Sequence, residues 1–367
     1  MNKPGIAILG LDHWYAAFSL ADEAANNDQV RLVAVADDYE ARAQQTARRY
    51  GAEIATTDNR TVLDRDDVDI VIAMYSTDRN VAVCRDAANA GKHIVSVKPV
   101  AMDLTGADAI VEAVRAAGVH FFPYESVYRL APGMQRVKGW IDEGRIGQPL
   151  RYMQTLHSSL PRAWHESTSS GWWLDPAAGT AVVQNTPPIP DNTDSGWWVN
   201  PARVPGGGWL DHAIYAVDMA RWFFGAEPAS VQGVVANRRH PELPLEDYGF
   251  ATYTLANGVV ATIEDTWTAE RGFFFNHSEI IGSAGAIRDE TRTTGRMLLR
   301  GDFGFDGWTA LEQQGPGPSK IIDHMLACIA GTSAPVATVT DARANLAACL
   351  AFYRAAGSGT AVQIEQA

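Results

Sequence analysis

The fold is set by an early stretch of the chain, Ile6-Ala7-Ile8-Leu9-Gly10-Leu11-Asp12-His13-Trp14-Tyr15. Its apolar first part predicts a buried strand over 6–9, and the residues from 13 to 26 have the pattern of a helix. A second apolar run predicts another strand over 31–36, which closes on Asp37 and Asp38. The stretch therefore predicts a strand, a turn at Gly10, a helix and a second strand.

The rest of the first third repeats this alternation. Further strands are expected over 69–74, 93–97 and 119–122, and further helices over 40–50, 79–90 and 104–117. Strands that are apolar throughout and are joined by helices form a parallel sheet covered on both faces. Helical crossovers then give an α/β, doubly wound domain whose ligand crevice lies at the carboxyl ends of the strands.

The pattern changes after about residue 125. A helix is expected over 132–143, and half-buried strands are expected over 231–236 and 249–255. Asn257-Gly258 predicts a hairpin into a strand over 259–267, since type I′ turns need positive φ. We therefore expect a doubly wound domain over 1–125 and an α+β domain with an antiparallel or mixed sheet over 126–367. A last helix over 341–355, capped by Asp341 and followed by Gly357, is a candidate to pack back on the first domain.

Composition indicates an ordinary globular protein and argues against several classes of function. The chain has 367 residues, 30 Lys+Arg, 43 Asp+Glu and a net charge of −13, which argues against a nucleic-acid partner. The apolar run near the amino terminus is too short for that of a signal peptide. No stretch approaches the roughly 20 apolar residues of a membrane span. Cys84, Cys328 and Cys349 form no CxxC pair and suit a reducing compartment, so the cytoplasm is the expected location.

A local repeat marks an insertion over about 167–205. Ser170-Gly171-Trp172-Trp173-Leu174-Asp175-Pro176-Ala177 returns as Ser195-Gly196-Trp197-Trp198-Val199-Asn200-Pro201-Ala202. Two copies are too few for a solenoid, so a tandem duplication that lengthened one loop is the simplest explanation. The tryptophans of this region are expected either to line a ligand pocket, because indoles stack on sugars and flat apolar ligands, or to pack under a loop or in a subunit interface.

The first strand–helix turn has the layout of a dinucleotide site. Asp37 follows the second strand and would accept the ribose hydroxyls, and its charge favours NAD over NADP. The glycine pattern is broken, since Asp12 and Tyr15 stand where the second and third glycines are usual. Asp12 either opposes the diphosphate or caps the following helix with its own carboxylate. A Rossmann scaffold without nucleotide is therefore an alternative.

Three longer segments carry a family resemblance. They are 91–101 (GKHIVSVKPVA), 129–132 with 144–150 (RLAP and GRIGQPL), and 206–218 (GGGWLDHAIYAVD). In this order they resemble the GKHVLxEKPxA, RxxP…GRIGxPL and GGGxLxDxGxHxxD segments of the glucose-fructose oxidoreductase / inositol dehydrogenase / MocA (Gfo/Idh/MocA) family. Shorter matches at 246–250, 256–264 and 281–286, and the final helix, extend the resemblance over nearly the whole chain.

The resemblance implies a Rossmann domain, a C-terminal domain with an open-faced sheet, and a homodimer or homotetramer. It also implies an NAD(P)-dependent oxidoreductase that acts on a hydroxyl or carbonyl of a sugar, polyol or glycoside-like substrate. Carried over residue by residue, the catalytic groups are Lys98, Asp211 and Tyr215. Tyr215 stands where histidine is usual, as in the glucose-fructose oxidoreductase branch, and Val97 replaces the glutamate before the lysine.

The candidate site residues form three groups. The catalytic group is Lys98, Asp211 and Tyr215; the cofactor group is Gly10, Asp12, His13, Trp14, Asp37, Ser76 and Lys98; the substrate group is Arg129, His157, Trp209 and His212. No metal is expected, because the histidine spacing fits no metal motif.

The expected chemistry is that of alcohol oxidation, in which one group takes the hydroxyl proton while hydride leaves carbon. A tyrosine with a pKa of about 10 is a poor base, but a neighbouring ammonium such as that of Lys98 favours the phenolate. Asp211 would orient the substrate or the lysine. Two alternatives stay open: a lyase or hydrolase with recycled or lost NAD, and a non-catalytic, ligand-sensing Rossmann protein.

Overall fold

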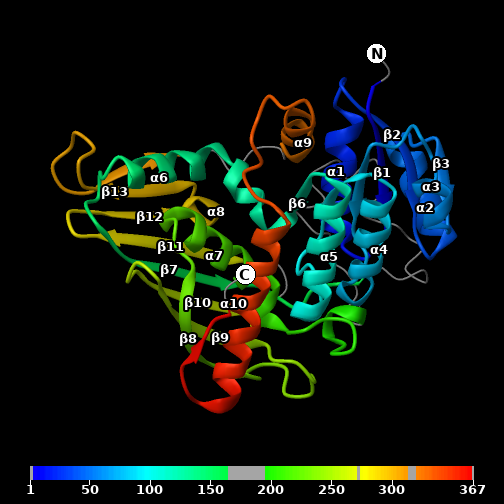
Figure 1. Ribbon diagram of the computed structural model, residues 1–367. Helices are drawn as coiled ribbons and strands as arrows, with labels where there is room; N and C mark the ends of the chain where they lie inside the picture. Colours follow the sequence, from blue (N-terminus) through cyan, green and yellow to red (C-terminus); the bar gives the residue numbers. More distant parts are fainter. Residues whose placement is uncertain (1–2, 164–194, 271–272, 313–319, 366–367) are drawn as a thin grey trace. The chain divides into compact units, whose positions relative to one another are not determined.

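The computed structural model describes residues 3–163, 195–270, 273–312 and 320–365 (Figure 1). They belong to two compact units. The first unit is Met1–Tyr124 with Arg162–Val204 and Ser319–Arg343, and the second is Glu125–Pro161 with Pro205–Pro318 and Ala344–Ala367, as far as these are described. Each unit thus draws on separate segments of the chain, whereas the sequence predicted contiguous domains. The first copy of the repeat, 170–177, lies outside the described residues.

A six-stranded parallel sheet forms the centre of the first unit, in the order β3-β2-β1-β4-β5-β6. Its strands are β1 (Gly5–Leu9), β2 (Arg31–Ala36), β3 (Ile54–Thr56), β4 (Ile70–Ala73), β5 (His93–Ser96) and β6 (Phe121–Pro123). Every residue of β1 and β4 is buried, as expected of strands covered on both faces. The predicted doubly wound α/β fold is confirmed, and β3 is an edge strand that the sequence analysis missed.

The crossover helices of this unit form two groups. The helices that follow the strands are α1 (Trp14–Ala25), α2 (Glu40–Tyr50), α3 (Asn59–Leu63), α4 (Thr77–Asn89) and α5 (Leu104–Ala117). A later segment of the chain adds α9 (Ile321–Ile329) to the same unit. From β1 the chain runs outward through β2 to β3, and from β4 it runs the other way through β5 to β6. Right-handed crossovers therefore place α1 and α2 on one face and α4 and α5, which pack together in Figure 1, on the other.

The second unit is built on a nine-stranded mixed sheet in the order β14-β13-β12-β11-β7-β10-β9-β8-β15. Its strands are β7 (Pro149–His157), β8 (Pro228–Ala236), β9 (Tyr248–Leu255), β10 (Val260–Thr266), β11 (Phe275–Gly282), β12 (Ala286–Glu290), β13 (Arg296–Arg300), β14 (Thr309–Glu312) and β15 (Val362–Gln363). The pair β7–β10 is parallel and the other pairs are antiparallel. The predicted hairpin at Asn257-Gly258 joins β9 to β10, with Gly258 at φ 85°.

The remaining helices are η1 (Tyr124–Leu130), α6 (Pro132–Asp142), η5 (Gly196–Val199), α7 (Gly208–Phe224), α8 (Thr291–Thr294) and α10 (Val339–Ser358). The expected end residues of α10 were wrong: the helix begins at Val339, and it continues through Gly357 to Ser358. Asp341 lies inside its first turn, where its carboxylate accepts a hydrogen bond from the N–H of Thr338 at 2.9 Å. No helix in the described part of the chain is both long and apolar enough to cross a membrane.

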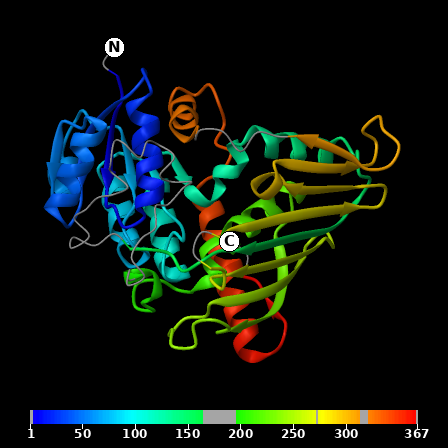
Figure 2. The same ribbon diagram turned by 180° about the vertical axis from the view of Figure 1, so that it is seen from behind.

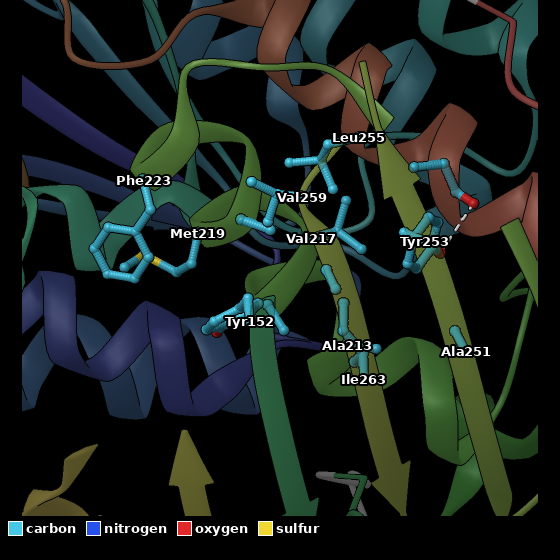
Figure 3. Close-up of a cluster of buried hydrophobic side chains, with 14 of the residues drawn as sticks. Tyr152, Ala213, Val217, Met219, Phe223, Ala251, Tyr253, Leu255, Val259 and Ile263 are labelled. Carbon is cyan, nitrogen blue, oxygen red and sulfur yellow. Dashed lines mark hydrogen bonds between the residues drawn. The ribbon is translucent and has the colours of Figure 1, made fainter. Parts of the chain in front are cut away.

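One face of the nine-stranded sheet carries α7, which packs on the central strands β7, β9 and β10. Figure 3 shows side chains of α7, among them Ala213, Val217 and Phe223, directed toward the strands. The Tyr253 hydroxyl donates a hydrogen bond to the Ala348 carbonyl at 3.1 Å within this core. In Figure 2, seen from behind, the strands lie in front of α7. The position and direction of α7 are thus fixed by an apolar core.

Candidate active site

The turn after β1 brings the backbone against the end of β4. Gly10 has φ 86°, and a Cβ at this position would lie 2.5 Å from the Tyr75 ring, so only glycine fits. Its N–H donates to the carbonyl of Ala36 at 2.8 Å, and the N–H of Leu11 donates to Asp37 Oδ2 at 2.9 Å. The turn is therefore tied to the end of β2.

Asp12 does not cap α1, so that interpretation was wrong. Its Oδ2 accepts a hydrogen bond from the N–H of Ser76, the N-cap residue of α4, at 2.9 Å. Its carboxylate also pairs with Arg42 at 3.2 Å and Arg203 at 3.7 Å. Burial raises the pKa of Asp12, but Arg42, the Ser76 N–H and Arg203 outweigh this, and the net pKa lies below its usual value. The carboxylate is thus a neutralised group directed at α4.

Asp37 is fully buried at the end of β2. It accepts hydrogen bonds from the Leu11 and Tyr39 N–H groups, both at 2.9 Å, and from the Arg42 guanidinium at 2.6 Å. Burial raises the pKa of Asp37, and Arg42 offsets only part of this rise. The acidic residue that a dinucleotide site requires is present, with an arginine beside it.

These residues fit a dinucleotide. α1 begins without a side-chain cap hydrogen bond or an acidic residue in its first turn, which suits a diphosphate at the helix N-terminus. Gly10 permits close approach of the backbone, and Asp37 stands where the ribose hydroxyls are bound in such sites. The obstacle foreseen at Asp12 is removed, because its charge is compensated by two arginines.

The other cofactor candidates lie at the carboxyl ends of the same parallel strands. His13 is fully buried, and its Nδ1 lies 3.0 Å from the Tyr75 carbonyl. The Trp14 indole donates to the Arg162 carbonyl at 2.9 Å. Ser76 follows β4 and Lys98 follows β5, so the structure brings the predicted cofactor group together at one edge of the sheet.

Lys98 lies beneath the second copy of the repeat. Its side chain is among the most buried in the protein, at 1% exposure, and its Nζ lies 5.5 Å from the centre of the Trp198 ring. Trp198 stacks on Trp197 with 4.0 Å between the ring centres. The centre of the His13 imidazole lies 4.6 Å from that of Trp197 and 4.8 Å from that of Trp198. The described part of the insertion therefore packs on the edge that carries the cofactor candidates.

In the second unit, three glycines allow α7 to begin against the start of β9. A Cβ on Gly207 would lie 2.2 Å from the Glu246 carbonyl. The Glu246 carboxylate accepts hydrogen bonds from the N–H groups of Gly207 at 2.9 Å and Trp209 at 3.2 Å, and from the Tyr353 hydroxyl at 2.7 Å. Glu246 thus takes the place of a cap at the helix N-terminus and fixes the first turn of α7.

The first turn of α7 carries Asp211 and His212 into a polar cluster with the buried residues Asp265 and Trp267. Trp267, which follows β10, donates from Nε1 to Asp211 Oδ2 at 3.0 Å. His212 Nδ1 lies 3.6 Å from both Asp211 Oδ2 and Asp265 Oδ1. Asp265 is 1% exposed, and burial raises its pKa to about 7 against the lowering effect of His212. A carboxyl that titrates near neutrality therefore lies beside the predicted catalytic aspartate.

Tyr215 lies one turn further along α7. The centre of its ring lies 5.5 Å from the centre of the Tyr128 ring, and the Tyr128 hydroxyl accepts a hydrogen bond from Arg292. Tyr215 and His212 both line a pocket of about 360 Å³ between α7, η1, α6 and strands of the sheet. The predicted acid/base and one predicted substrate residue therefore share a cavity.

Three predicted substrate residues lie elsewhere. The Arg129 guanidinium is buried and forms two hydrogen bonds with the Asp218 carboxylate, at 2.9 and 2.6 Å. Trp209 has no exposed surface and stacks on Phe352 at 3.8 Å. His157 ends β7, with its Nε2 3.7 Å from Glu264. None of the three lines the pocket that contains Tyr215.

Sequence reasoning missed Asp265 and Trp267. In β10 the buried side chains alternate, and Asp265 has the same parity as the buried Ala261 and Ile263. A charged residue at a core position of a strand is the signal that would have identified it. Among the described residues, no group of three His, Cys, Asp or Glu side chains could hold a metal ion.

Comparison with known proteins identifies both parts of the chain. Residues 5–125 match the model described as "Oxidoreductase family, NAD-binding Rossmann fold", and residues 180–288 match "GFO/IDH/MocA C-terminal domain". The chain belongs to the Gfo/Idh/MocA oxidoreductase family. This confirms the predicted family, the oxidoreductase class and the NAD-binding Rossmann domain.

Relatives in the Gfo/Idh/MocA family cover most of the chain. "scyllo-inositol 2-dehydrogenase (NAD(+))" of Bacillus subtilis (strain 168) is 26% identical over 98% of this chain and 96% of its own length. "Inositol 2-dehydrogenase" of Rhizobium meliloti (strain 1021) is 29% identical over 74% of this chain and 72% of its own. A solved structure, "Levoglucosan dehydrogenase, complex with NADH and L-sorbose", has a TM-score of 0.81 and 21% identity over the whole of both chains, which shows the shared fold.

Proposed function

We propose that this chain is an NAD-dependent dehydrogenase of a hydroxyl group on a cyclic polyhydroxy compound, with Tyr215 as its acid/base. The observation that carries the proposal is the arrangement of three side chains at the amino end of α7. There Asp211 is held by Trp267, His212 lies between two carboxylates, and Tyr215 lines a pocket. The relatives named for scyllo-inositol and inositol support a ring-shaped polyol or sugar as the substrate.

NAD, when bound, would supply the hydride acceptor for the carbon that carries the reacting hydroxyl. Gly10, the N-terminus of α1 and Asp37 would hold it. The part played by the chain is proton transfer and orientation. Tyr215 takes the hydroxyl proton in oxidation and returns it in reduction, which is a role within reach of a tyrosine whose phenolate is favoured by a nearby cation.

Lys98 supplies that cation in this proposal and also donates a hydrogen bond to the substrate oxygen. Its place at the carboxyl end of β5, beside the other cofactor candidates and under the Trp198 ring, supports this role. Asp211 orients the substrate. Arg129 and Trp209 have no role in the proposal. The Arg129 guanidinium is hydrogen-bonded to Asp218, and the Trp209 ring is stacked on Phe352 in the core.

The test begins with calorimetric titration of NAD and NADP, in which we expect NAD to bind more tightly because of the carboxylate of Asp37. NADH formation is then followed with myo-inositol, scyllo-inositol, levoglucosan and glucose. Tyr215→Phe and Lys98→Ala should each lower kcat by about 100-fold or more, and in Tyr215→Phe the Kd of NAD should stay the same. Lys320→Ala, at an exposed lysine, is the control.

Full turnover in Tyr215→Phe would refute the acid/base assignment. Turnover without NADH formation would favour a lyase or hydrolase, and ligand binding without turnover would favour a sensor; none of the relatives described above supports either alternative. The homodimer or homotetramer and the cytoplasmic location stay predictions.

A further inference from the structure

The pocket beside Tyr215 continues well beyond it along α7. One face of the helix lines this pocket from His212 through Tyr215 and Met219 to Phe223. At a rise of about 1.5 Å per residue this stripe is about 16 Å long, or three helical turns. A single pyranose or inositol ring that reacts at Tyr215 would occupy only one end of such a cavity.

The wall opposite α7 is polar at positions where the sheet is otherwise apolar. In the register of β7, β11 and β12, Tyr152 pairs with Ile280 and Ile280 pairs with Ile287, and all three are buried core residues. Two positions away along the strands, on the same face of the sheet, the paired residues are polar: Gln154 pairs with Ser278, and Ser278 pairs with Asp289. A row of polar side chains on the inner face of a sheet indicates a surface that contacts something other than the core.

These polar groups are ordered by one another. The Tyr152 hydroxyl donates to Gln154 Oε1 at 2.8 Å, and Gln154 Nε2 donates to Asn276 Oδ1 at 2.5 Å. This chain of hydrogen bonds orders both amides, and Gln154 and Asn276 both line the pocket. Amides and hydroxyls held in this way are the groups that give orientation in small-molecule sites.

The charges on the wall balance. Arg136 and Arg292 line the pocket together with Asp289 and Glu312. The charges of two arginines and two carboxylates cancel, so the wall has no net charge to attract a charged ligand, and a neutral ligand is favoured. An apolar and aromatic stripe on one side and a row of amides and hydroxyls on the other suit a ligand with one C–H face and many hydroxyls.

We propose that this extension is a subsite for a second sugar ring, so that the substrate is a disaccharide-sized glycoside whose oxidised ring lies at Tyr215. The inference rests on the proposed function and narrows its substrate class. The neutral, amphipathic walls favour a carbohydrate over a charged or wholly apolar aglycone.

The experiment compares kcat/KM for NADH formation on matched pairs: glucose with cellobiose, maltose and trehalose, and methyl glucoside with phenyl glucoside. The wild-type protein should prefer a disaccharide to its monosaccharide by about tenfold or more. Ser278→Phe, which fills the subsite, should lower the disaccharide-to-monosaccharide ratio by about tenfold. Thr254→Phe adds similar bulk at an exposed position of β9 and should leave the ratio unchanged.

If Ser278→Phe does not fold, Asn276→Ala removes a pocket-lining amide without added bulk and should lower the same ratio. An unchanged ratio in both variants, or equal use of mono- and disaccharides by the wild type, would overturn the subsite while the proposed function stands. A preference for phenyl glucoside over every disaccharide would overturn the carbohydrate assignment. NAD binding with no NADH from any sugar or polyol would instead overturn the proposed function itself.

Discussion

The indole Nε1 of Trp267 donates a hydrogen bond to Oδ2 of Asp211 at 3.0 Å, and this contact ties the end of β10 to the first turn of α7. Trp267 is 1% exposed, so the hydrogen bond is shielded from water. A donor to a carboxylate in such surroundings holds that carboxylate in one orientation, and Asp211 is the aspartate to which the proposed function gives an orienting role.

Trp267→Phe keeps an aromatic ring and removes the donor. We expect kcat/KM to fall by about tenfold, because Asp211 loses its fixed orientation, and stability to fall by about 1.5–3 kcal/mol. Steady-state kinetics and urea denaturation measure the two effects. Trp308→Phe, at an exposed tryptophan, is the control. Unchanged kinetics in Trp267→Phe would mean that Asp211 does not depend on this hydrogen bond.

Asp265 gives the protein a predictable dependence of stability on pH. Burial raises its pKa to about 7 in the folded state, whereas an unfolded aspartate titrates at about 3.9. A raised folded pKa contributes stability that is complete below the unfolded pKa and is lost as pH rises through the folded pKa. The contribution of Asp265 to the stability of the wild type should therefore be lost as the pH rises from about 4 to about 8.

Asp265→Asn removes this titration and should flatten the profile, with a difference from wild type on the order of a few kcal/mol. Urea denaturation at several pH values measures it. Asp142→Asn, at an exposed carboxylate of α6, should follow the wild-type curve. The same slope in Asp265→Asn and wild type would show that another group titrates.

Trp198 is expected to control access to Lys98. Because Lys98 is 1% exposed and its ammonium lies 5.5 Å from the Trp198 ring centre, the indole covers the amine. Trp198→Ala should raise the rate at which an amine-reactive reagent labels Lys98 by about tenfold, and Trp198→Phe should raise it less. Mass spectrometry of the labelled peptide gives the rate, with the exposed Lys320 as an internal standard. Equal labelling in wild type and Trp198→Ala would show that other groups cover the amine.

The first unit could be predicted well from the sequence because its signals are local. Apolar runs that fill whole strands, and helices that stop at glycines such as Gly51 and Gly118 with positive φ, place strand and helix within a few residues. The edge strand β3 was missed because it is only three residues long and partly exposed. Its pairing with β2 depends on tertiary contacts, which no local pattern records.

The candidate site could be predicted only in part. Lys98, Asp211 and Tyr215 came from the resemblance to the segments of the Gfo/Idh/MocA family, and the structure places two of them on one helix, α7. The partners of Asp12 could not be foreseen, because Arg42 and Arg203 are far from it in sequence and reach it only through the fold. The interpretation of Arg129 met the same limit: its motif suggests a ligand, and only the structure shows that Asp218 engages it.

The Arg129–Asp218 pair yields a last prediction, which separates a structural role from a substrate-binding one. Asp218 is fully buried and accepts hydrogen bonds from Ser126, Arg129 and Asn345. Asp218→Asn leaves a buried guanidinium without its counter-charge and should cost about 3–5 kcal/mol of stability by urea denaturation. Asp142→Ala, which breaks the exposed Lys138 pair, should cost about 0.5 kcal/mol or less. If Arg129 instead binds substrate, Arg129→Lys would raise KM with little change in the denaturation midpoint; a structural role requires a lower midpoint.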